Sequence, residues 1–415
     1  MQLTSRDRTM LDGQRGPALA MAMRVIVRLG DAMGADHLLD ITNAHIDSCL
    51  HHGQAGLDFA RALVAGGGEV GVPTTLNVSS LDLLHPELFR GDPDFGTDAR
   101  ALMQCYEDLG CTPTWTCAPY QRVERPAFGD HIAWAESNAI VFANSVLGAR
   151  TARYGDFVDI CAALTGRAPA SSFHLDEHRR GGAVFDVSSI GERIAHGAGP
   201  ALLGHVIGAR TGTTVPVVVG CPRLDEDQLK TLGSAAASAG SVAMFHVVGS
   251  TPEAPSLEAA LGAVLLADVS VQSLTSSDLA EAWEQLSTTD TTDLGAVSLG
   301  TPHYSINEFA ILVELVRGMS FRVPFYVSTG REIVTELTLR GWLPVLEEAG
   351  VQLVTDTCTY ITPVMAPFDG AAMTDSPKWA YYAPGNLGID VVFGTVGDCV
   401  RSAVEGRVVR TGDTW

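Results

Sequence analysis

Apolar and polar positions along the chain alternate in two rhythms, one helical and one strand-like. Residues 18–29 (ALAMAMRVIVRL) repeat apolar positions at helical spacing, which predicts an amphipathic helix ending near Gly30. Residues 69–77 (EVGVPTTLN) predict a strand, whereas residues 225–239 predict a helix with a strand after it over residues 241–248. Because strand, loop and helix recur in this order, we predict an α/β fold of repeated strand–loop–helix units around a central cleft.

Polar residues follow several of the expected strands. They include Asn77, Cys117, His246, residues 301–303 (Thr-Pro-His) and residues 356–358 (Asp-Thr-Cys). Parallel sheets bind ligands at their carboxyl ends, where the following helices present free N–H groups and the positive ends of their dipoles. We therefore expect several of these strand ends to converge on one cleft.

The stretch 116–150 places polar side chains among Ala, Ile, Val and Phe, with few helix breakers. Burying amides and a carboxylate without partners would cost several kcal/mol, so these side chains are expected to line a polar cavity. The members concerned are His131, Trp134, Glu136, Ser137, Asn138, Asn144 and Arg150.

Composition and charge narrow the possibilities. A hydrophobic content of 46% and a charged content of 18% in 415 residues allow a deep core and predict one large lobed unit or two to three domains. The formal net charge of -21 repels nucleic acid and anionic membranes, so neither is expected as a partner. No secretory signal opens the chain and its apolar runs are too short to span a bilayer, which together predict a soluble cytoplasmic protein.

The eight cysteines are scattered without a CxxC pair, which favours free thiols or metal ligands over disulfides. Cys117 and Cys358 each follow an apolar, strand-like run, and a thiolate there can bind a metal or an iron–sulfur cluster. A buried cysteine that acts as a small apolar residue is the alternative at both positions. Cys49, after the polar residues AHIDS, is intermediate, and spacing alone does not select a ligand set.

Several familiar motifs are missing from the sequence. It contains no HExxH metal motif, no glycine-rich nucleotide motif and no GxSxG elbow. Nucleotide cofactors and a serine-hydrolase triad are therefore disfavoured.

Long segments of the chain closely resemble the large, catalytic component of the aconitase X family. The matching segments are VPTTLN (72–77), TCAPYQ (116–121), HIAWAESNAIVFANSVLGART (131–151), HLDEHR (174–179), LKTLGSAAASAGSVAMFHVVGSTPEA (229–254), TPHYS (301–305) and DTC (356–358). The resemblance covers nearly the whole chain, so residues 1–415 are expected to form the catalytic region, with three closely packed α/β lobes around an iron site. It also implies a small swivelling domain, which is expected to be a separate subunit because nothing in this sequence resembles it.

The resemblance implies a dehydratase. Family members act on cis-3-hydroxy-L-proline in bacteria and on mevalonate 5-phosphate in archaea, where the pattern is Gly-Cys-Pro-His. This chain has Gly-Thr-Pro-His at 300–303 and therefore is similar to the hydroxyproline branch. The expected reaction is conversion of cis-3-hydroxy-L-proline to Δ1-pyrroline-2-carboxylate. Alternatives are a mevalonate 5-phosphate dehydratase, a non-catalytic iron–sulfur protein, and a metal-free protein that binds carbohydrate or amino acids.

The resemblance also implies roles for individual residues. Iron is expected as a cofactor, as a 2Fe-2S cluster in preference to a 4Fe-4S cluster, and a serine of the small subunit is expected to act as base. Arg150 is a candidate for the substrate carboxylate because a guanidinium can bind both oxygens at once. For Glu136, a structural hydrogen bond to a helix end is the alternative. The expected metal ligands are Cys49, Cys117 and Cys358, the catalytic candidates are Glu136, Ser137 and Asn138, and the substrate-binding candidates are His45, Asn77, Asn144, Arg150, His303 and Lys378.

Overall fold

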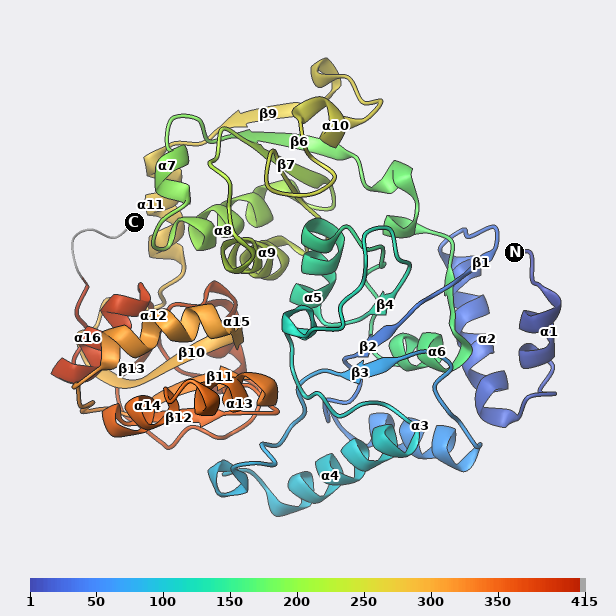
Figure 1. The fold of residues 1–415 in the computed structure, drawn as a ribbon, viewed down its shortest axis with the longest axis horizontal. Coiled ribbons are helices and arrows are strands. Elements are labelled where there is room, and N and C mark those ends of the chain that lie inside the picture. The colour runs from blue at the N-terminus through green and yellow to red at the C-terminus, as the bar shows by residue number, and fades with distance from the viewer. Residues whose placement is uncertain (411–415) are drawn as a thin grey trace. The chain divides into compact units, whose positions relative to one another are not determined.

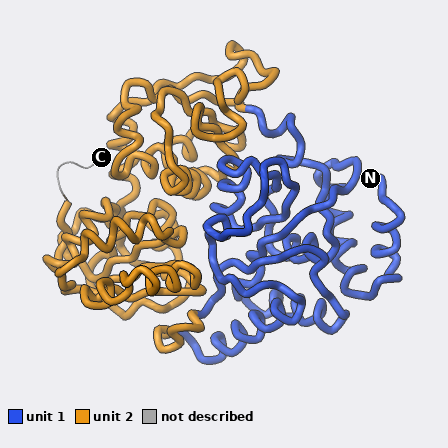
Figure 2. The backbone as a smooth tube through the Cα atoms, in the orientation of Figure 1, with its two compact units in different colours: residues 1–81, 91–180 blue, residues 82–90, 181–415 orange. Residues whose placement is uncertain are grey.

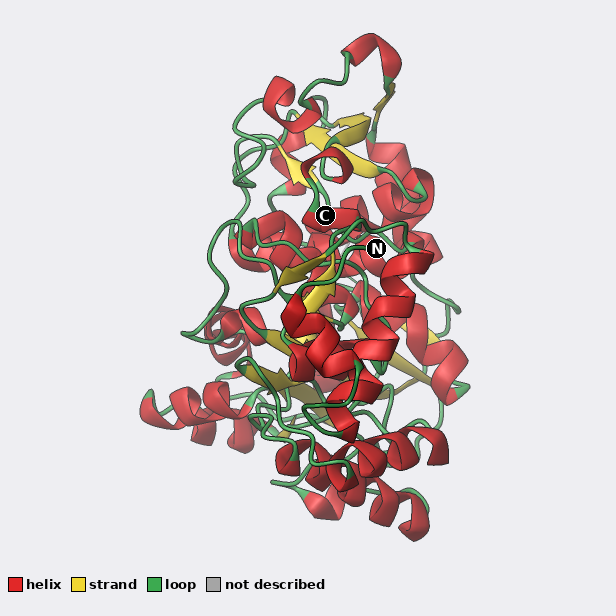
Figure 3. Ribbon diagram, turned by 90° about the vertical axis from the view of Figure 1, so that its right-hand side faces the viewer, coloured by secondary structure: helices red, strands yellow, loops and turns green. Residues whose placement is uncertain are grey.

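The computed structural model describes residues 1–410, which divide into two compact units (Figure 2). Unit 1 comprises residues 1–81 and 91–180, and unit 2 comprises residues 82–90 and the chain from Gly181 onward. Helices flank short strands in both units (Figure 3), and the three larger sheets are parallel. The predicted α/β fold of repeated strand–loop–helix units is therefore confirmed.

Unit 1 is built on a parallel three-stranded sheet in the order β3-β2-β4 (Figure 1). Its carboxyl ends lie at Ile46, Leu76 and Trp134. A second, antiparallel pair joins β1 to β5. The strands are β1 (Leu38–Asp40), β2 (Ala44–Ile46), β3 (Thr74–Leu76), β4 (Ala133–Trp134) and β5 (Arg167–Pro169).

Helix α2 shows how the apolar pattern is used in unit 1. It begins at Pro17, where the missing N–H costs no hydrogen bond, and it buries Ala22, Met23 and Ile26. It continues past Gly30 to Ala32, because one glycine weakens a helix by only about 1 kcal/mol. The helices are α1 (Ser5–Leu11), α2 (Pro17–Ala32), α3 (Gln54–Ala65), α4 (Pro93–Asp108), α5 (Ser137–Phe142), a π-helix (Ala143–Leu147) and α6 (Val158–Thr165).

The predicted strands are shorter in the structure than their apolar runs. Residues 69–77 contribute only Thr74–Leu76 as strand β3, and residues 241–248 contribute only His246–Val247 as strand β8. In the first run, Val70 and Gly71 donate their N–H groups to Leu109 and Ala163, so their backbone is bonded outside the sheet. The helix predicted over residues 225–239 is confirmed as α9 (Glu226–Gly240), with Asp225 as its N-cap.

The first half of unit 2 carries a parallel sheet in the order β8-β7-β6-β9. Helices α8 and α9 pack closely, since a Cβ on Gly204 would lie 2.2 Å from the carbonyl oxygen of Leu232. The strands are β6 (Gly181–Asp186), β7 (Val215–Val219), β8 (His246–Val247) and β9 (Ser270–Ser273), and the helices are α7 (Gly191–Ile194), α8 (Gly199–Thr211), α9, α10 (Leu257–Leu261) and α11 (Ser276–Gln285).

The second half of unit 2 carries a parallel sheet in the order β12-β11-β10-β13-β14, with the longest strand in its centre. The chain leaves β10 toward β11 and later returns to pair β13 on the other side, so the strand order reverses beside β10. The strands are β10 (Leu294–Tyr304), β11 (Phe325–Thr329), β12 (Val351–Val354), β13 (Ala371–Thr374) and β14 (Val391–Phe393), and the helices are α12 (Ile306–Val316), α13 (Arg331–Leu339), α14 (Leu343–Ala349), α15 (Pro377–Leu387) and α16 (Val396–Glu405).

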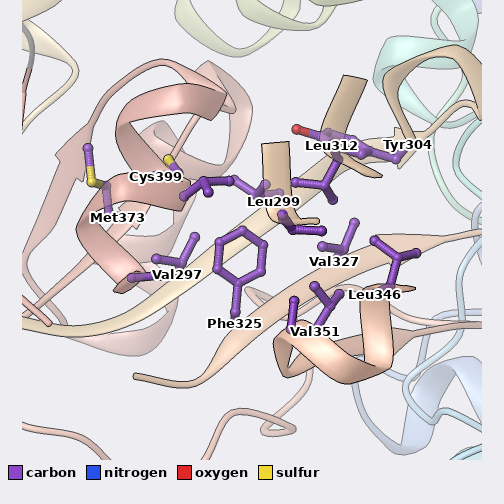
Figure 4. Packing of buried hydrophobic residues seen from close by; sticks show 14 of the residues in the cluster. Val297, Leu299, Tyr304, Leu312, Phe325, Val327, Leu346, Val351, Met373 and Cys399 are labelled. Carbon is purple, nitrogen blue, oxygen red and sulfur yellow. The ribbon is translucent and has the colours of Figure 1, made fainter. Parts of the chain in front are cut away.

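One face of this five-stranded sheet forms the main core of unit 2 (Figure 4). Alternate residues of the central strands, such as Val297 and Phe325, meet Leu312 of α12 and Leu346 of α14. Cys399 of α16 belongs to the same apolar cluster and is therefore a core residue. Among residues 1–410, no helix combines the length and the apolar character that a bilayer span requires.

Adjacent positions on α12 test this packing. Leu312 is buried in the core, whereas Ile311 is 58% exposed. Leu312→Ala is expected to lower the free energy of unfolding of unit 2 by about 2–5 kcal/mol, because it leaves a cavity among residues that cannot fully close around it. Ile311→Ala is the matched control and should cost under about 1 kcal/mol. Urea unfolding followed by circular dichroism measures both, and equal losses would contradict the assigned core.

Candidate functional site

A thiol and an imidazole lie together in unit 2, near the carboxyl ends of β10 and β12. The ligand atoms of His303 and Cys358 lie within 4.8 Å of each other, and both side chains are buried. The ring Nε2 of His303 is 3.2 Å from the carbonyl oxygen of Thr357. Burial lowers the pKa of His303 to about 4, helped by the charges of Lys230 and Lys378, so the ring is neutral at pH 7. A neutral imidazole beside a thiol is a donor pair that suits iron or zinc.

Two carboxylates fix the loop that carries Cys358: Asp82, from a distant part of the sequence, and Asp356, from the loop itself. Asp82 accepts hydrogen bonds from the backbone N–H and the hydroxyl of Thr355, at 2.7 and 2.8 Å. Asp356 adopts a left-handed φ of 61° and binds Arg331 with both oxygens, at 2.6 and 2.7 Å. These contacts explain why residues 82–90 belong to unit 2, and they hold the backbone on the amino side of Cys358.

The residues before His303 meet the loop after β13. Ser376 donates its hydroxyl to the carbonyl oxygen of Thr301, and Ser376 also caps α15 through the N–H of Trp379. The hydroxyl of Thr301 is buried and makes no hydrogen bond in the structure. Lys378, a predicted substrate-binding residue, lies in the first turn of α15 and is buried. The predicted convergence of polar strand ends is thus observed within unit 2 for residues 301–303 and 356–358.

In unit 1, Cys117 belongs to a network with the three catalytic candidates. Asn138 donates to the carbonyl oxygen of Cys117 at 2.8 Å and also to the carboxylate of Glu136. Glu136 accepts the N–H of Ala139 at 2.8 Å and is therefore the N-cap of α5. The hydroxyl of Ser137 donates to Glu136 at 3.2 Å. The structural alternative for Glu136, a hydrogen bond to a helix end, is observed, while a catalytic role for these residues stays a prediction.

Two buried polar atoms without a hydrogen-bond partner lie near the ends of β2 and β3 in unit 1. The Nδ1 of His45 is 2.8 Å from the hydroxyl of Thr75, but its buried Nε2 makes no hydrogen bond in the structure. Asn77 donates to the carboxylate of Asp47, and its own buried Oδ1 is left without a partner. The side chain of Asn77 and the backbone of Thr116 favour the charged form of His45 and partly oppose the effect of burial on its pKa, so these groups lie near one another, and a contact to a bound ligand stays a prediction.

Asp47 is a candidate that the sequence reasoning missed. Burial and the charges of Glu136 and Asp156 raise the pKa of Asp47 to about 7. A carboxyl group that titrates near neutral pH can both take up and release a proton. The sequence feature that could have identified Asp47 is its position between His45 and Cys49, directly after a short strand.

Three other predicted residues have contacts within unit 1 that serve its structure. Asn144 binds both the N–H and the carbonyl oxygen of Thr151, each at 3.0 Å. Arg150 donates to the carbonyl oxygen of His174 at 3.0 Å and to Asp176 at 2.5 Å. The Sγ of Cys49 lies 3.3 Å from the carbonyl oxygen of Ile46, and burial raises the pKa of this thiol well above its ordinary value. Ligand binding by these three residues stays a prediction.

The fold and these contacts define an α/β protein with parallel sheets and a buried thiol–imidazole pair at strand ends. Models of the aconitase X first, second and third domains match residues 1–177, 183–284 and 294–405, so the chain belongs to the aconitase X family. The family predicted from the sequence is confirmed.

The chain is similar to proteins of two kinds. It is 40% identical over 412 residues to a cis-3-hydroxy-L-proline dehydratase of Pseudomonas aeruginosa, a match covering 98% of this chain and 70% of that protein. It is 33% identical over 387 residues to a phosphomevalonate dehydratase large subunit of Thermococcus kodakarensis, covering 92% of this chain and 95% of that subunit. The crystal structure of Thermococcus kodakaraensis aconitase X in its holo-form superimposes with a TM-score of 0.86 at 31% identity, covering 97% of this chain and 100% of that chain.

A pair of histidines beside Arg150 provides a test of the electrostatics of unit 1. The Nδ1 atoms of His131 and His174 are 3.0 Å apart, and the Nε2 of His174 is 2.7 Å from the hydroxyl of Tyr154. Burial lowers the pKa of His174 to about 3, and the charges of His131 and nearby arginines act in the same direction. The folded state therefore holds this ring neutral.

His174→Gln is expected to make unit 1 less sensitive to acid. The folded pKa of His174 lies below its ordinary value of 6.5, so between pH 6.5 and about 3 the unfolded chain binds a proton that the folded chain does not. As the pH falls through this range, the free energy of unfolding should therefore decrease by up to about 1.4 kcal/mol per pH unit because of this ring alone. At pH 7 the variant should be less stable than the natural chain, and the gap should narrow as the pH falls. Urea unfolding from pH 7 to 4 measures this. His37→Gln, at an exposed histidine of the same unit, is the control, and a constant gap for His174→Gln would refute the expectation.

Proposed function

We propose that this chain dehydrates cis-3-hydroxy-L-proline to Δ1-pyrroline-2-carboxylate. The observation that carries the proposal is the similarity to cis-3-hydroxy-L-proline dehydratases of Pseudomonas aeruginosa and Hypocrea jecorina, at 40% and 39% identity over 98% of the chain. The phosphomevalonate dehydratase large subunits match at 30–35% identity. Both groups are dehydratases, so the predicted hydro-lyase class is confirmed.

We propose iron as the cofactor, held by Cys117 and Cys358, as a 2Fe-2S cluster. Support within unit 2 is the buried pair of Cys358 and the neutral His303, because thiolate and imidazole are donors that suit iron. His303 and Cys49 are the two candidates for a further ligand. When bound, iron supplies a Lewis acid that helps the 3-hydroxyl group to leave.

The side chains of unit 1 can position the substrate. The unpaired Nε2 of His45 and Oδ1 of Asn77 offer hydrogen bonds to polar groups of a bound ring. Asn138 links Glu136 to the backbone of Cys117, so a change in this network would alter the geometry around that thiol. The Cα proton is weakly acidic and needs a positioned base, which we assign to a serine of a small swivelling-domain subunit.

We infer such a partner because several relatives are themselves named large subunits. A cytoplasmic location is proposed because no disulfide joins any of the eight cysteines, all of which lie in the described residues, and free thiols suit a reducing compartment.

Anaerobic co-expression with a small-subunit candidate, followed by assays with cis-3-hydroxy-L-proline and with mevalonate 5-phosphate, tests the proposed reaction. Imine formation only with both subunits is expected. Inactivity of an iron-loaded complex on cis-3-hydroxy-L-proline would overturn the proposal. Activity on mevalonate 5-phosphate but not on cis-3-hydroxy-L-proline would favour the phosphomevalonate dehydratase reaction.

Cysteine substitutions test the metal ligands. Cys117→Ala and Cys358→Ala should each reduce bound iron and sulfide to background and lower kcat/KM at least a hundredfold, because a cluster lacking a thiolate is lost. Cys105→Ala is the control, since Cys105 is also buried but belongs to helix α4. Cys49→Ala and His303→Ala distinguish the two candidates for the further ligand. Iron analysis and absorption spectra give the readout, and full iron content in Cys358→Ala would exclude that residue as a ligand.

A further inference from the structure

A short segment of the chain, residues 82–90, belongs to unit 2 although the chain on both sides of it belongs to unit 1 (Figure 2). We call this segment the strap. Asp82 at its start is 2% exposed, whereas Leu84 is 47% exposed, so the strap has a buried face and a solvent face. With this little buried apolar surface, the strap depends on specific polar contacts to stay in place.

The strap holds the amino side of the cysteine loop, residues 355–363, which follows β12 and carries Cys358. Asp82 accepts the N–H and the hydroxyl of Thr355 at 2.7 and 2.8 Å. The N–H of Leu83 donates to the carboxylate of Asp356 at 3.0 Å. Two consecutive residues of the strap are therefore bonded to two consecutive residues of the loop.

The strap also holds the carboxyl side of the cysteine loop. The N–H of Arg90 donates to the carbonyl oxygen of Pro363 at 2.8 Å. Leu88 packs against the small apolar cluster that contains Val364, which is fully buried. The strap thus contacts the chain before and after Cys358, so both stems of the loop rest on it.

Between these stems the cysteine loop is a tight turn. The carbonyl oxygen of Cys358 accepts the N–H groups of Ile361 and Thr362, each at 3.2 Å. The hydroxyls of Thr357 and Thr362 lie 2.7 Å apart. Because the turn is bonded to itself, the place of the Cys358 thiol is set by the position of its stems. The thiol is 1% exposed, so a reagent reaches it only when the loop opens.

Asp82 is the central contact of the strap. Its carboxylate accepts five hydrogen bonds, which come from the N–H groups of Leu84, His85 and Thr355, the ring Nδ1 of His85 and the hydroxyl of Thr355. Burial alone would raise the pKa of Asp82, but the hydrogen bonds from His85 and Thr355 outweigh burial and hold this pKa below its ordinary value. An amide in its place would turn an NH₂ group toward donors and leave them without an acceptor.

We propose that Asp82 is a positioning residue for the iron site, because its carboxylate holds the strap against the cysteine loop and so sets the place of the Cys358 thiol. The inference deepens the proposed function, since it rests on Cys358 as an iron ligand and names the segment that holds this ligand. Ligands of a site need a place fixed to within about 0.5 Å, which neighbouring hydrogen bonds supply.

Alkylation of cysteines in the full, metal-free chain tests the proposal. Cys358 and Cys399 are both buried in unit 2, but Cys399 belongs to its main core and reports unfolding of the whole unit. Asp82→Asn should raise the rate of Cys358 alkylation by iodoacetamide about tenfold through local opening, with the rate for Cys399 changed less than about twofold. Mass spectrometry of the separate cysteine peptides measures both rates in one sample.

Two further variants complete this test. Asp398→Asn is the matched control, because Asp398 is a buried carboxylate of unit 2 that caps α16, the helix carrying Cys399. It should not accelerate Cys358 selectively. His85→Gln keeps the carboxylate of Asp82 and removes only its partly exposed ring partner, so Cys358 alkylation should rise about threefold. This milder variant decides the matter if Asp82→Asn does not fold.

Binding of cobalt(II) to the reduced chain gives a spectroscopic readout of the same position. The thiolate-to-cobalt absorption band that is lost in Cys358→Ala reports this thiol as a ligand. In Asp82→Asn, half-saturation of this band should need about tenfold more cobalt, because the free loop must first be ordered. Asp398→Asn should leave the cobalt requirement unchanged.

Equal acceleration of Cys358 and Cys399 in Asp82→Asn would overturn the inference, because Asp82 would then only stabilise unit 2. Unchanged alkylation of Cys358 in a folded Asp82→Asn or His85→Gln variant would overturn it as well. Neither measurement needs substrate or a partner subunit, so this failure is separable from failure of the proposed function. Selective opening at Cys358 in a chain that is inactive with both subunits present would contradict only the reaction.

Discussion

Parallel pairing of β10 with β11 on one side and β13 on the other is the constraint on which the site in unit 2 depends. Because the chain leaves these neighbouring strands in opposite directions, the loops at their carboxyl ends part and leave space between them. Thr301 and His303 stand at one of these ends, and Asp375 and Ser376 stand at the other. The buried sheet fixes the strands through apolar contacts, so polar residues at their ends need not contribute to the core.

Burial has opposite consequences for the donors and the carboxylates of this unit. It holds the imidazole of His303 neutral, which leaves a lone pair available to a metal. Burial also raises the pKa of Asp375 to about 6 and that of Glu308 to about 7, while the charge of Lys230 opposes the effect of burial on both carboxylates. The same low-dielectric surroundings thus keep the imidazole neutral and make the carboxylates depend on the nearby charge of Lys230.

The sequence could predict the fold class and the strand-end positions of polar residues because both follow from local periodicity. It predicted that residues 301–303 and 356–358 end strands, and His303 and Cys358 do lie together in unit 2. It could not predict that Asp82 holds Thr355, since 273 residues separate them and no local pattern encodes such a contact. Nor could it limit β3 to three residues, because tertiary hydrogen bonds of Val70 and Gly71 end the pairing that the apolar run allows. For Arg150 the chemistry of the guanidinium suggested a carboxylate ligand, yet its partner within unit 1 is Asp176.

Helix capping explains why Asp225 and Glu308 lie at helix starts, but it does not explain Asp375. Asp225 accepts the N–H of Gln228, and Glu308 accepts the N–H of Ser305, so these two satisfy helix α9 and the start of α12. Asp375 precedes Ser376, which already caps α15, and its carboxylate instead accepts the hydroxyl of Tyr304. A neutral amide could accept that hydroxyl as well, and without the cost of desolvating a charge. The charge of the buried Lys230 favours the charged form of Asp375, so a positive group that stabilises this carboxylate is already present within unit 2.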